Sequence, residues 1–241
     1  LVYRERPTVT LSSSNQTITY GSTLPSAGNA SGLLNGDTLS QSVTSPSLSG
    51  AGLLRASADP YSIGHNLSAL GYNVSGSLGT ITVNRKALTI SGLTSANKTY
   101  DGNTTATLTG TAALQSAIAA ASGVSNDGRR ITGDTVSLTG TAIATFNSKD
   151  VTSATTVSFT GLSLTGTHAS NYTLTPHASA SHTITPKALT ISAPSIANKV
   201  YDGSTAAGAL TLGALSGFVT GETLAVTGSA AALSSANAGS Y

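Results

Sequence analysis

Short segments in which apolar and polar residues alternate run along the chain, separated by turn residues. In one of them, Leu88 and Ile90 alternate with Thr89 and Ser91. Successive side chains of a strand point to opposite faces, so such a segment buries one face of a β-strand. The same alternation recurs at Val136/Leu138, Val157/Phe159, Leu162/Leu164 and Tyr172/Leu174. Spacings of about 8–12 residues between the segments predict an all-β protein built of antiparallel β-sandwiches.

This pattern of strands is itself repeated along the chain. The segment Lys-Ala-Leu-Thr-Ile-Ser at residues 86–91 returns at 187–192, and Asn-Lys-x-Tyr-Asp-Gly at 97–102 returns at 198–203. Both pairs are offset by 101 residues, whereas the repeats of solenoid proteins are about 20–50 residues long. The repeating unit is therefore a whole domain. Tandem domains of this kind more often supply length and spacing than chemistry.

A diverged copy of the unit precedes these two. It keeps a Tyr-Gly pair at residues 20–21, a Gly-acid-Thr triplet and a Tyr-Asn pair, in the same order and with shorter connections. The matching triplets are Gly36-Asp37-Thr38, Gly133-Asp134-Thr135 and Gly221-Glu222-Thr223. We therefore predict three domains, at residues 7–84, 85–186 and 187–241, of which the last ends in mid-repeat.

The joints between these repeats contain no flexible linker. At the second joint, an extended Ile184-Thr185 segment leads through Pro186 directly into the next repeat. Proline fixes its own φ and restricts the preceding residue to extended conformations, whereas flexible linkers are long and rich in Gly and Ser. We expect such short joints to limit bending between neighbouring repeats.

The middle repeat contains an insertion, residues 111–130, that the third repeat lacks. It is rich in alanine, which has the highest helix propensity. We therefore predict one short helix, with Thr111 as its N-cap and Gly123 at its end. Its apolar stripe against the sheet would consist of Leu114, Ile118 and Ala121.

Composition excludes several classes of function. Only 8% of the residues are charged and the net charge is +2, which is too small and too dispersed for nucleic-acid binding. The absence of cysteine excludes disulfides, thiol catalysis and cysteine metal sites. No apolar run reaches the about 18–20 residues that span a membrane, and residues 1–6 do not resemble a signal peptide. We interpret the chain as a piece of a longer protein whose export signal and anchor lie outside it.

The repeated motifs resemble a known family. The order Lys-Ala-Leu-Thr-Ile, Asn-Lys-x-Tyr-Asp-Gly, Gly-acid-Thr and Asn-Tyr is similar to the YDG repeat, and the first repeat resembles its relative, the mostly-bacterial Ig-like (MBG) repeat. Such repeats occur in tandem in large bacterial surface proteins that resemble filamentous haemagglutinins exported by two-partner secretion. The resemblance implies Ig-like β-sandwiches in the stalk of an extracellular adhesin that acts in cell attachment and biofilms. Its partners would be the rest of the adhesin, an outer-membrane transporter, and extracellular polysaccharide or a host or sibling cell surface.

The acidic residues of the repeated motifs allow two interpretations. Asp-Gly after a tyrosine favours a tight turn, because type I′ turns require positive φ. The predicted turn residues are Tyr100, Asp101, Gly102, Tyr201, Asp202 and Gly203. Alternatively, acidic side chains hold a calcium ion, which needs six to eight oxygen ligands. The candidate ligands are Asp101, Asp134, Asp202 and Glu222. Nine acidic residues in the whole chain favour the turn, and no other cofactor is expected.

Few residues suggest direct binding or catalysis. No Gly-x-Ser-x-Gly motif and no histidine pair with metal-ligand spacing occurs, so we do not expect an enzyme. The best candidates for contacting a glycan are Arg129 and Arg130 in the insertion, together with Tyr61, the tyrosine that we expect to be exposed. The sequence thus predicts a structural spacer. The alternatives are a carbohydrate- or matrix-binding module and a filament subunit that assembles by strand exchange.

Overall fold

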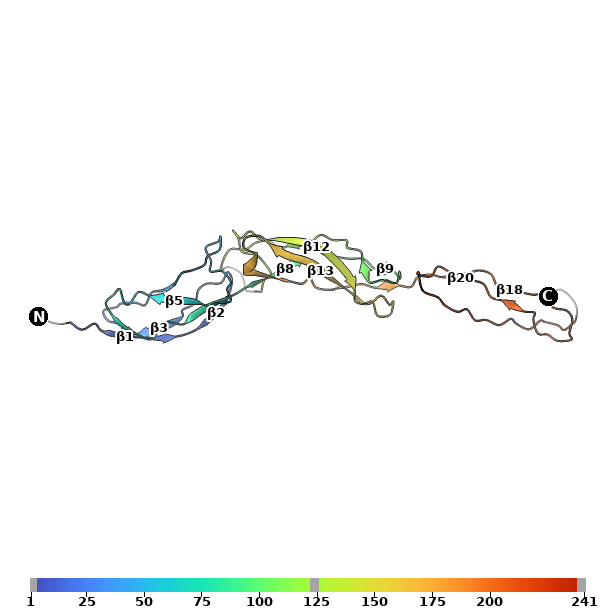
Figure 1. The fold of residues 1–241 in the computed structure, drawn as a ribbon, viewed down its shortest axis with the longest axis horizontal. Coiled ribbons are helices and arrows are strands. Elements are labelled where there is room, and N and C mark those ends of the chain that lie inside the picture. Colours follow the sequence, from blue (N-terminus) through green and yellow to red (C-terminus); the bar gives the residue numbers. More distant parts are fainter. Residues whose placement is uncertain (1–3, 122–125, 238–241) are drawn as a thin grey trace. The chain divides into compact units, whose positions relative to one another are not determined.

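The chain folds almost entirely into β-structure (Figure 1). A computed structural model describes residues 4–121 and 126–237. Within these residues the regular elements are β-strands and one 3-10 turn, η1 (Ala169–Asn171), and no α-helix is present. The all-β prediction is therefore confirmed.

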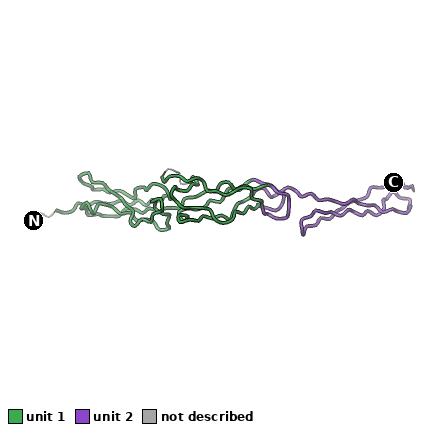
Figure 2. Tube along the Cα trace, turned by 90° about the horizontal axis from the view of Figure 1, so that it is seen from above, with its two compact units in different colours: residues 1–96, 106–145, 157–180 green, residues 97–105, 146–156, 181–241 purple. Residues whose placement is uncertain are grey.

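The chain divides into two compact units, which Figure 2 distinguishes by colour. Unit 1 consists of residues 1–96, 106–145 and 157–180, and unit 2 of residues 97–105, 146–156 and 181–241. Unit 1 thus contains the first repeat and most of the second. Unit 2 contains the third repeat together with three segments of the second, residues 97–105, 146–156 and 181–186.

In unit 1, the opening strands of the first repeat lie in two different sheets. The first sheet has the order β3 (Gly28–Ser31)-β1 (Thr8–Ser13)-β6 (Asn73–Ser75). The second has the order β2 (Gln16–Thr19)-β7 (Thr80–Asn84)-β5 (Tyr61–His65)-β4 (Gln41–Val43). The burial of β7 alternates, with Ile81 and Val83 each 2% exposed, as its apolar-polar pattern requires.

The second repeat begins with the same arrangement. Its first strand, β8, pairs with one antiparallel and one parallel neighbour, as β1 does. This sheet has the order β11 (Ala113–Leu114)-β8 (Lys86–Ser91)-β14 (Tyr172–Thr175). The longest strands of the chain belong to a further sheet, of order β10 (Thr105–Ala106)-β12 (Ser137–Phe146)-β13 (Thr156–Thr165)-β15 (Ala180–Ser181).

The prediction of purely antiparallel sheets is wrong, because each of the first two repeats contains parallel pairs. The pairs β1–β6 and β2–β7 in the first repeat correspond in the second to β8–β14 and to the pair of β9 (Lys98–Thr99) with β16 (Ile184–Thr185). Parallel pairing requires a long crossover connection. The strands of each pair are separated by most of a repeat, which supplies that connection.

The helix predicted in the insertion is also wrong for its described part, residues 111–121. Ala113 and Leu114 form β11 and pair with Ser91 and Ile90 of β8. The Ile118 N–H donates to Arg130 O at 2.9 Å, and Ile118 forms a separate, parallel bridge with Ile131. Tertiary pairing with β8 outweighs the helix propensity of alanine, which amounts to a few tenths of a kcal/mol per residue. The predicted helix end at Gly123 lies outside the described residues.

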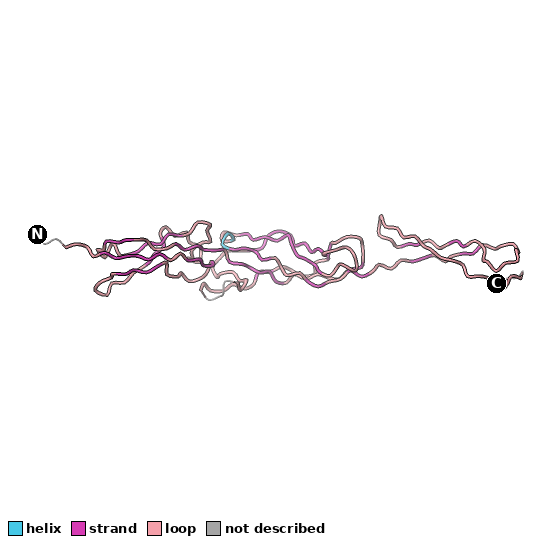
Figure 3. The backbone as a smooth tube through the Cα atoms, turned by 90° about the horizontal axis from the view of Figure 1, so that it is seen from below, coloured by secondary structure: helices cyan, strands magenta, loops and turns pink. Residues whose placement is uncertain are grey.

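Unit 2 consists of short strand pairs, drawn in magenta in Figure 3. The pairs are β9 (Lys98–Thr99) with β16 (Ile184–Thr185), β17 (Thr190–Ile191) with β20 (Leu215–Ser216), and β18 (Ser195–Ile196) with β19 (Leu210–Thr211). In the third repeat, Val200 and Tyr201 are 89% and 65% exposed. Their counterparts in the second repeat, Thr99 and Tyr100, are bonded to β16.

The main hydrophobic core of unit 1 contains residues from two successive repeats. Only Arg85 separates β7 from β8, so the chain passes between the repeats in extended conformation. The shared core combines Tyr20, Ala27, Leu54, Ile81 and Val83 of the first repeat with Leu88, Ile131, Val136 and Tyr172 of the second. A smaller core lies within the first repeat alone and comprises Val9, Leu11, Leu67, Tyr72 and Leu78.

Candidate functional site

The most distinctive site in the structure is the joint between the first and second repeats. Strand β2 ends at Thr19, and the N–H of the next residue, Tyr20, donates at 2.8 Å to the carbonyl of Asn84, the last residue of β7. This bond places Tyr20 at the border of the second repeat. Gly21 follows with φ +91°, and a Cβ there would lie 2.7 Å from Ile131 Cδ1. A glycine is therefore needed for the turn after Tyr20, here called a tyrosine turn, to pack directly against the second repeat.

The second repeat meets this tyrosine with a buried carboxylate. Residues 131–134 form a turn, here called an acid turn, in which the Asp134 N–H donates to Ile131 O at 3.2 Å. Asp134 is 4% exposed, and its Oδ2 accepts hydrogen bonds from Tyr20 at 2.7 Å and from Tyr172 at 2.6 Å. The two rings meet edge to face with centroids 5.3 Å apart. One carboxylate thus joins a tyrosine of each repeat.

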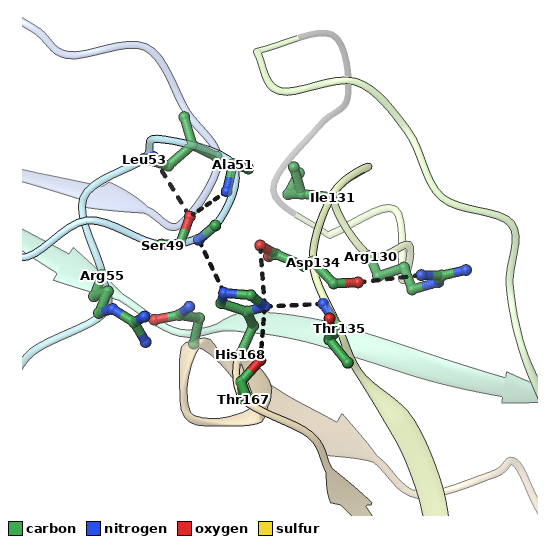
Figure 4. A network of polar contacts seen from close by, with 12 residues as sticks. Ser49, Ala51, Leu53, Arg55, Arg130, Ile131, Asp134, Thr135, Thr167 and His168 are labelled. Carbon is green, nitrogen blue, oxygen red and sulfur yellow. Dashed lines mark hydrogen bonds and ion pairs between the residues drawn. The ribbon is translucent and has the colours of Figure 1, made fainter.

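Further polar contacts surround this carboxylate, as Figure 4 shows. The backbone N–H groups of Gly50, in the first repeat, and Thr135 lie 2.9 Å from the two ring nitrogens of His168. Asn171 is fully buried and accepts from the Ala56 N–H at 3.1 Å. The second repeat therefore holds the loop of residues 49–56 at several points.

Burial determines the protonation of the two tyrosines. Burial raises the pKa of Tyr172 well above the ordinary value of 10, and its hydrogen bond to Asp134 acts in the same direction. Burial also raises the pKa of Tyr20, with a partly opposing effect of the Ser49 side chain. Both phenols therefore remain protonated donors to the carboxylate, because ionising either one would place two negative charges side by side.

The same arrangement recurs within unit 2, between the second and third repeats. The Tyr100 N–H donates to Thr185 O at 2.9 Å, and the Tyr100 hydroxyl donates to the carboxylate of Glu222. The Glu222 N–H in turn donates to Val219 O at 3.0 Å, which forms an acid turn like that of residues 131–134. A Cβ on Gly102 would lie 2.8 Å from Val219 Cγ1. Tyrosine turn and acid turn thus form a recurring contact between successive repeats, here called the Tyr–acid contact.

The aspartates of the two Tyr-Asp-Gly motifs have a local role. Asp101 lies 2.6 Å from Lys98 Nζ, and Asp202 lies 2.7 Å from Lys199 Nζ. Each also accepts from a backbone N–H two residues later, that of Asn103 at 3.2 Å or Ser204 at 2.9 Å. These bonds define a tight turn. No cluster of three or more potential metal ligands occurs in the described residues, and the calcium interpretation stays a prediction.

We expect the pKa of Asp202 to be about 2, because Lys199 and the Ser204 N–H stabilise its carboxylate. Because this pKa lies below the ordinary value of 3.8, the contribution of the pair to stability is present above pH 3.8 and is lost as the pH falls through about 2. Carboxyl carbon NMR shifts against pH measure the value. Lys199→Ala should return it towards the ordinary value, while Lys149→Ala should leave it unchanged. A normal pKa in the unmodified chain would contradict the pairing.

The residues predicted to contact a ligand are engaged in intramolecular bonds. Arg129 donates from Nε to Ser116 O at 2.9 Å, and Arg130 donates to the carbonyl oxygen of Asp134 at 3.3 Å. Tyr61 is half-buried and its hydroxyl donates to Arg55 O at 2.9 Å. The expectation that Tyr61 is exposed is therefore wrong, whereas Tyr201 is 65% exposed.

Sequence reasoning missed the partners of the acid turn and a buried ion pair. Lys86, the repeated lysine that opens β8, is 2% exposed, and its Nζ lies 2.8 Å from Asp127. His168 and Tyr20 were not assigned a role either. A signal for Tyr20 existed, because each tyrosine turn is followed one repeat later by a Gly-acid-Thr triplet. Nothing in the sequence indicated that the two motifs meet across a joint.

The fold and these joints define an all-β tandem-repeat protein in which polar contacts link successive repeats and the first two repeats also share a hydrophobic core. The YDG domain family matches residues 84–180 and 185–241, more than half of the chain, which therefore belongs to the YDG domain family. No curated protein and no solved structure matches the chain at a significant level. Among the described residues, no helix is long and apolar enough to cross a membrane.

Proposed function

We propose that this chain is a structural spacer within an extracellular bacterial adhesin, where it separates an adhesive part from the cell surface. The observation that carries the proposal is the joint at Asp134, where two repeats share one hydrophobic core and one buried carboxylate. A spacer must resist bending at its joints. A joint made of a single residue between two strands, with buried contacts across it, supports that property.

The Tyr–acid contact suits this purpose on energetic grounds. A hydrogen bond to a charged group contributes about 1.5–3 kcal/mol, and the Tyr20 ring is also 1% exposed in the shared core. Bending the joint would expose that ring and leave Asp134 without one of its donors. Flexible joints between domains have no comparable cost, since their linkers are solvated and rich in Gly and Ser.

We further propose an Ig-like sandwich for each complete repeat, attached to a larger adhesin chain that an outer-membrane partner exports. Support for the sandwich comes from the division of neighbouring strands β1 and β2 between two sheets. Support for the adhesin context comes from membership of the YDG family and from the resemblance of the repeats to those of large surface proteins. Extracellular polysaccharide or a cell surface would be contacted by other parts of that chain.

Spin-label distance measurements test the spacer proposal. Spin labels are attached to cysteines introduced by Ser31→Cys in the first repeat and Ser158→Cys in the second. Both serines are exposed, and the chain has no cysteine of its own. We expect a single narrow distance distribution between labels at these positions. Tyr20→Ala should broaden it at least twofold, because the ring and its hydrogen bond are lost together. Tyr61→Phe serves as the matched control. A broad distribution in the chain with an intact joint would contradict the proposal.

A further inference from the structure

The first repeat contains an acid turn built like the two that take part in Tyr–acid contacts. It comprises residues 34–37, and its Asp37 N–H donates to Leu34 O at 3.0 Å. Tyr72 donates to Asp37 Oδ2 at 2.6 Å and accepts from the Leu34 N–H at 3.0 Å. Tyr172 makes the same two bonds, to Asp134 and from the Ile131 N–H at 2.9 Å. The acceptor half of the contact is thus fully formed in the first repeat.

The two acid turns differ in what covers them. Asp134 accepts from the tyrosines of two repeats, whereas Asp37 is bonded by the hydroxyl of Tyr72 alone among the described tyrosines. Ile131 is 2% exposed because the turn at Gly21 lies on it. Its counterpart Leu34 is 50% exposed. An exposed apolar side chain and a half-buried carboxylate with spare acceptor capacity therefore belong to the same turn.

The chain enters the first repeat in the same register as it enters the second. Thr8 of β1 pairs with Asn73 of β6, one residue after Tyr72, and Ala87 of β8 pairs with Thr173 of β14, one residue after Tyr172. A domain joined ahead of β1 would consequently lie beside residues 34–37, as the first repeat lies beside residues 131–134.

We propose that the acid turn at residues 34–37 is a docking site for the tyrosine turn of another repeat of this type, joined ahead of β1. The phenol of that repeat donates to Asp37, and the glycine that follows packs on Leu34. The proposal rests on the chemical complementarity between the acid turn and a tyrosine turn. The tyrosine turn supplies a neutral hydrogen-bond donor and a glycine without a Cβ, the two features by which Tyr20 and Gly21 contact the second repeat. The inference rests on the proposed spacer function and deepens it by naming the partner of this acid turn.

An extended chain tests this docking directly. Residues 85–186 are joined ahead of residue 7 of the complete chain, which reproduces the register of the joint at Pro186 and Lys187. A thiol introduced by Leu34→Cys is then labelled with a maleimide, in a chain that has no cysteine of its own. We expect labelling at least tenfold slower in the extended chain than in the original. Tyr100→Ala, made only in the added copy, should restore the fast rate.

Leu70→Cys provides the matched control, since Leu70 is 48% exposed in the same repeat and should label equally fast in both chains. Equal rates at Leu34→Cys in the two chains would overturn the docking site. Slow labelling that persists with Tyr100→Ala would also overturn it, because protection would then not depend on the tyrosine. The spin-label distances across the Asp134 joint are measured separately, so a failure of this inference is distinguishable from a failure of the spacer function.

Discussion

Replacing Asp134 by Ala is expected to lower the free energy of unfolding of unit 1 by about 3–5 kcal/mol, the cost of removing one partner from a buried charged network. The loss leaves the hydroxyls of Tyr20 and Tyr172 without their acceptor in a site where Asp134 is 4% exposed. Neither hydroxyl gains water in exchange while the core stays closed. Because the site joins two repeats, we expect them to unfold in separate transitions in this variant.

Urea unfolding of the whole chain measures this effect. Asp134→Asn keeps one acceptor oxygen, so it should cost less than Asp134→Ala. Asp59→Ala removes an exposed carboxylate and should change the free energy of unfolding by less than about 0.5 kcal/mol. If Asp134→Ala and Asp59→Ala had equal effects, the buried carboxylate would not hold the joint.

The strands could be predicted from sequence because their signal is local. The alternation around Leu88 and Ile90 is visible within one segment, and the structure places both residues in β8. Partner choice is not local, which is why the parallel pairs β1–β6 and β8–β14 were missed. The helix prediction failed for the same reason: Ala113 and Leu114 prefer helix intrinsically, yet the edge of β8 offers them backbone hydrogen bonds.

The contacts of the site could be predicted from the sequence only in part, for a similar reason. The repeat indicated that Tyr100 and Tyr201 are equivalent and that both precede turns, but it named no partner for either tyrosine. In the structure, Tyr20 and Tyr100 instead donate to an acid of the following repeat. A residue can recur in every repeat because of a contact within its own repeat or because of a contact with the next one. Only the structure distinguishes a contact within a repeat from one between repeats, since Tyr20 and Asp134 are 114 positions apart.

Lys86→Ala is expected to destabilise unit 1 by about 3–5 kcal/mol, because it leaves Asp127 as an uncompensated, largely buried charge. The Lys86 side chain is 3% and that of Asp127 15% exposed, and the two charged atoms are 2.8 Å apart. Burial opposes ionisation of Asp127, yet its pKa lies below the ordinary value, because the hydrogen bonds from Lys86 and the Arg129 N–H outweigh that effect. The pair's contribution therefore persists above the ordinary pKa and is lost in acid below the lowered one.

The third repeat offers a matched control for this variant. Lys187 opens its repeat as Lys86 does, but it is exposed, so Lys187→Ala should change the unfolding free energy by less than about 0.5 kcal/mol. The double variant Lys86→Met with Asp127→Leu removes both charges and should recover most of the stability that Lys86→Ala loses. Urea unfolding at neutral pH compares the three. A double variant as unstable as Lys86→Ala would show that the lysine stem and its packing in β8, rather than the ion pair, stabilise the start of the second repeat.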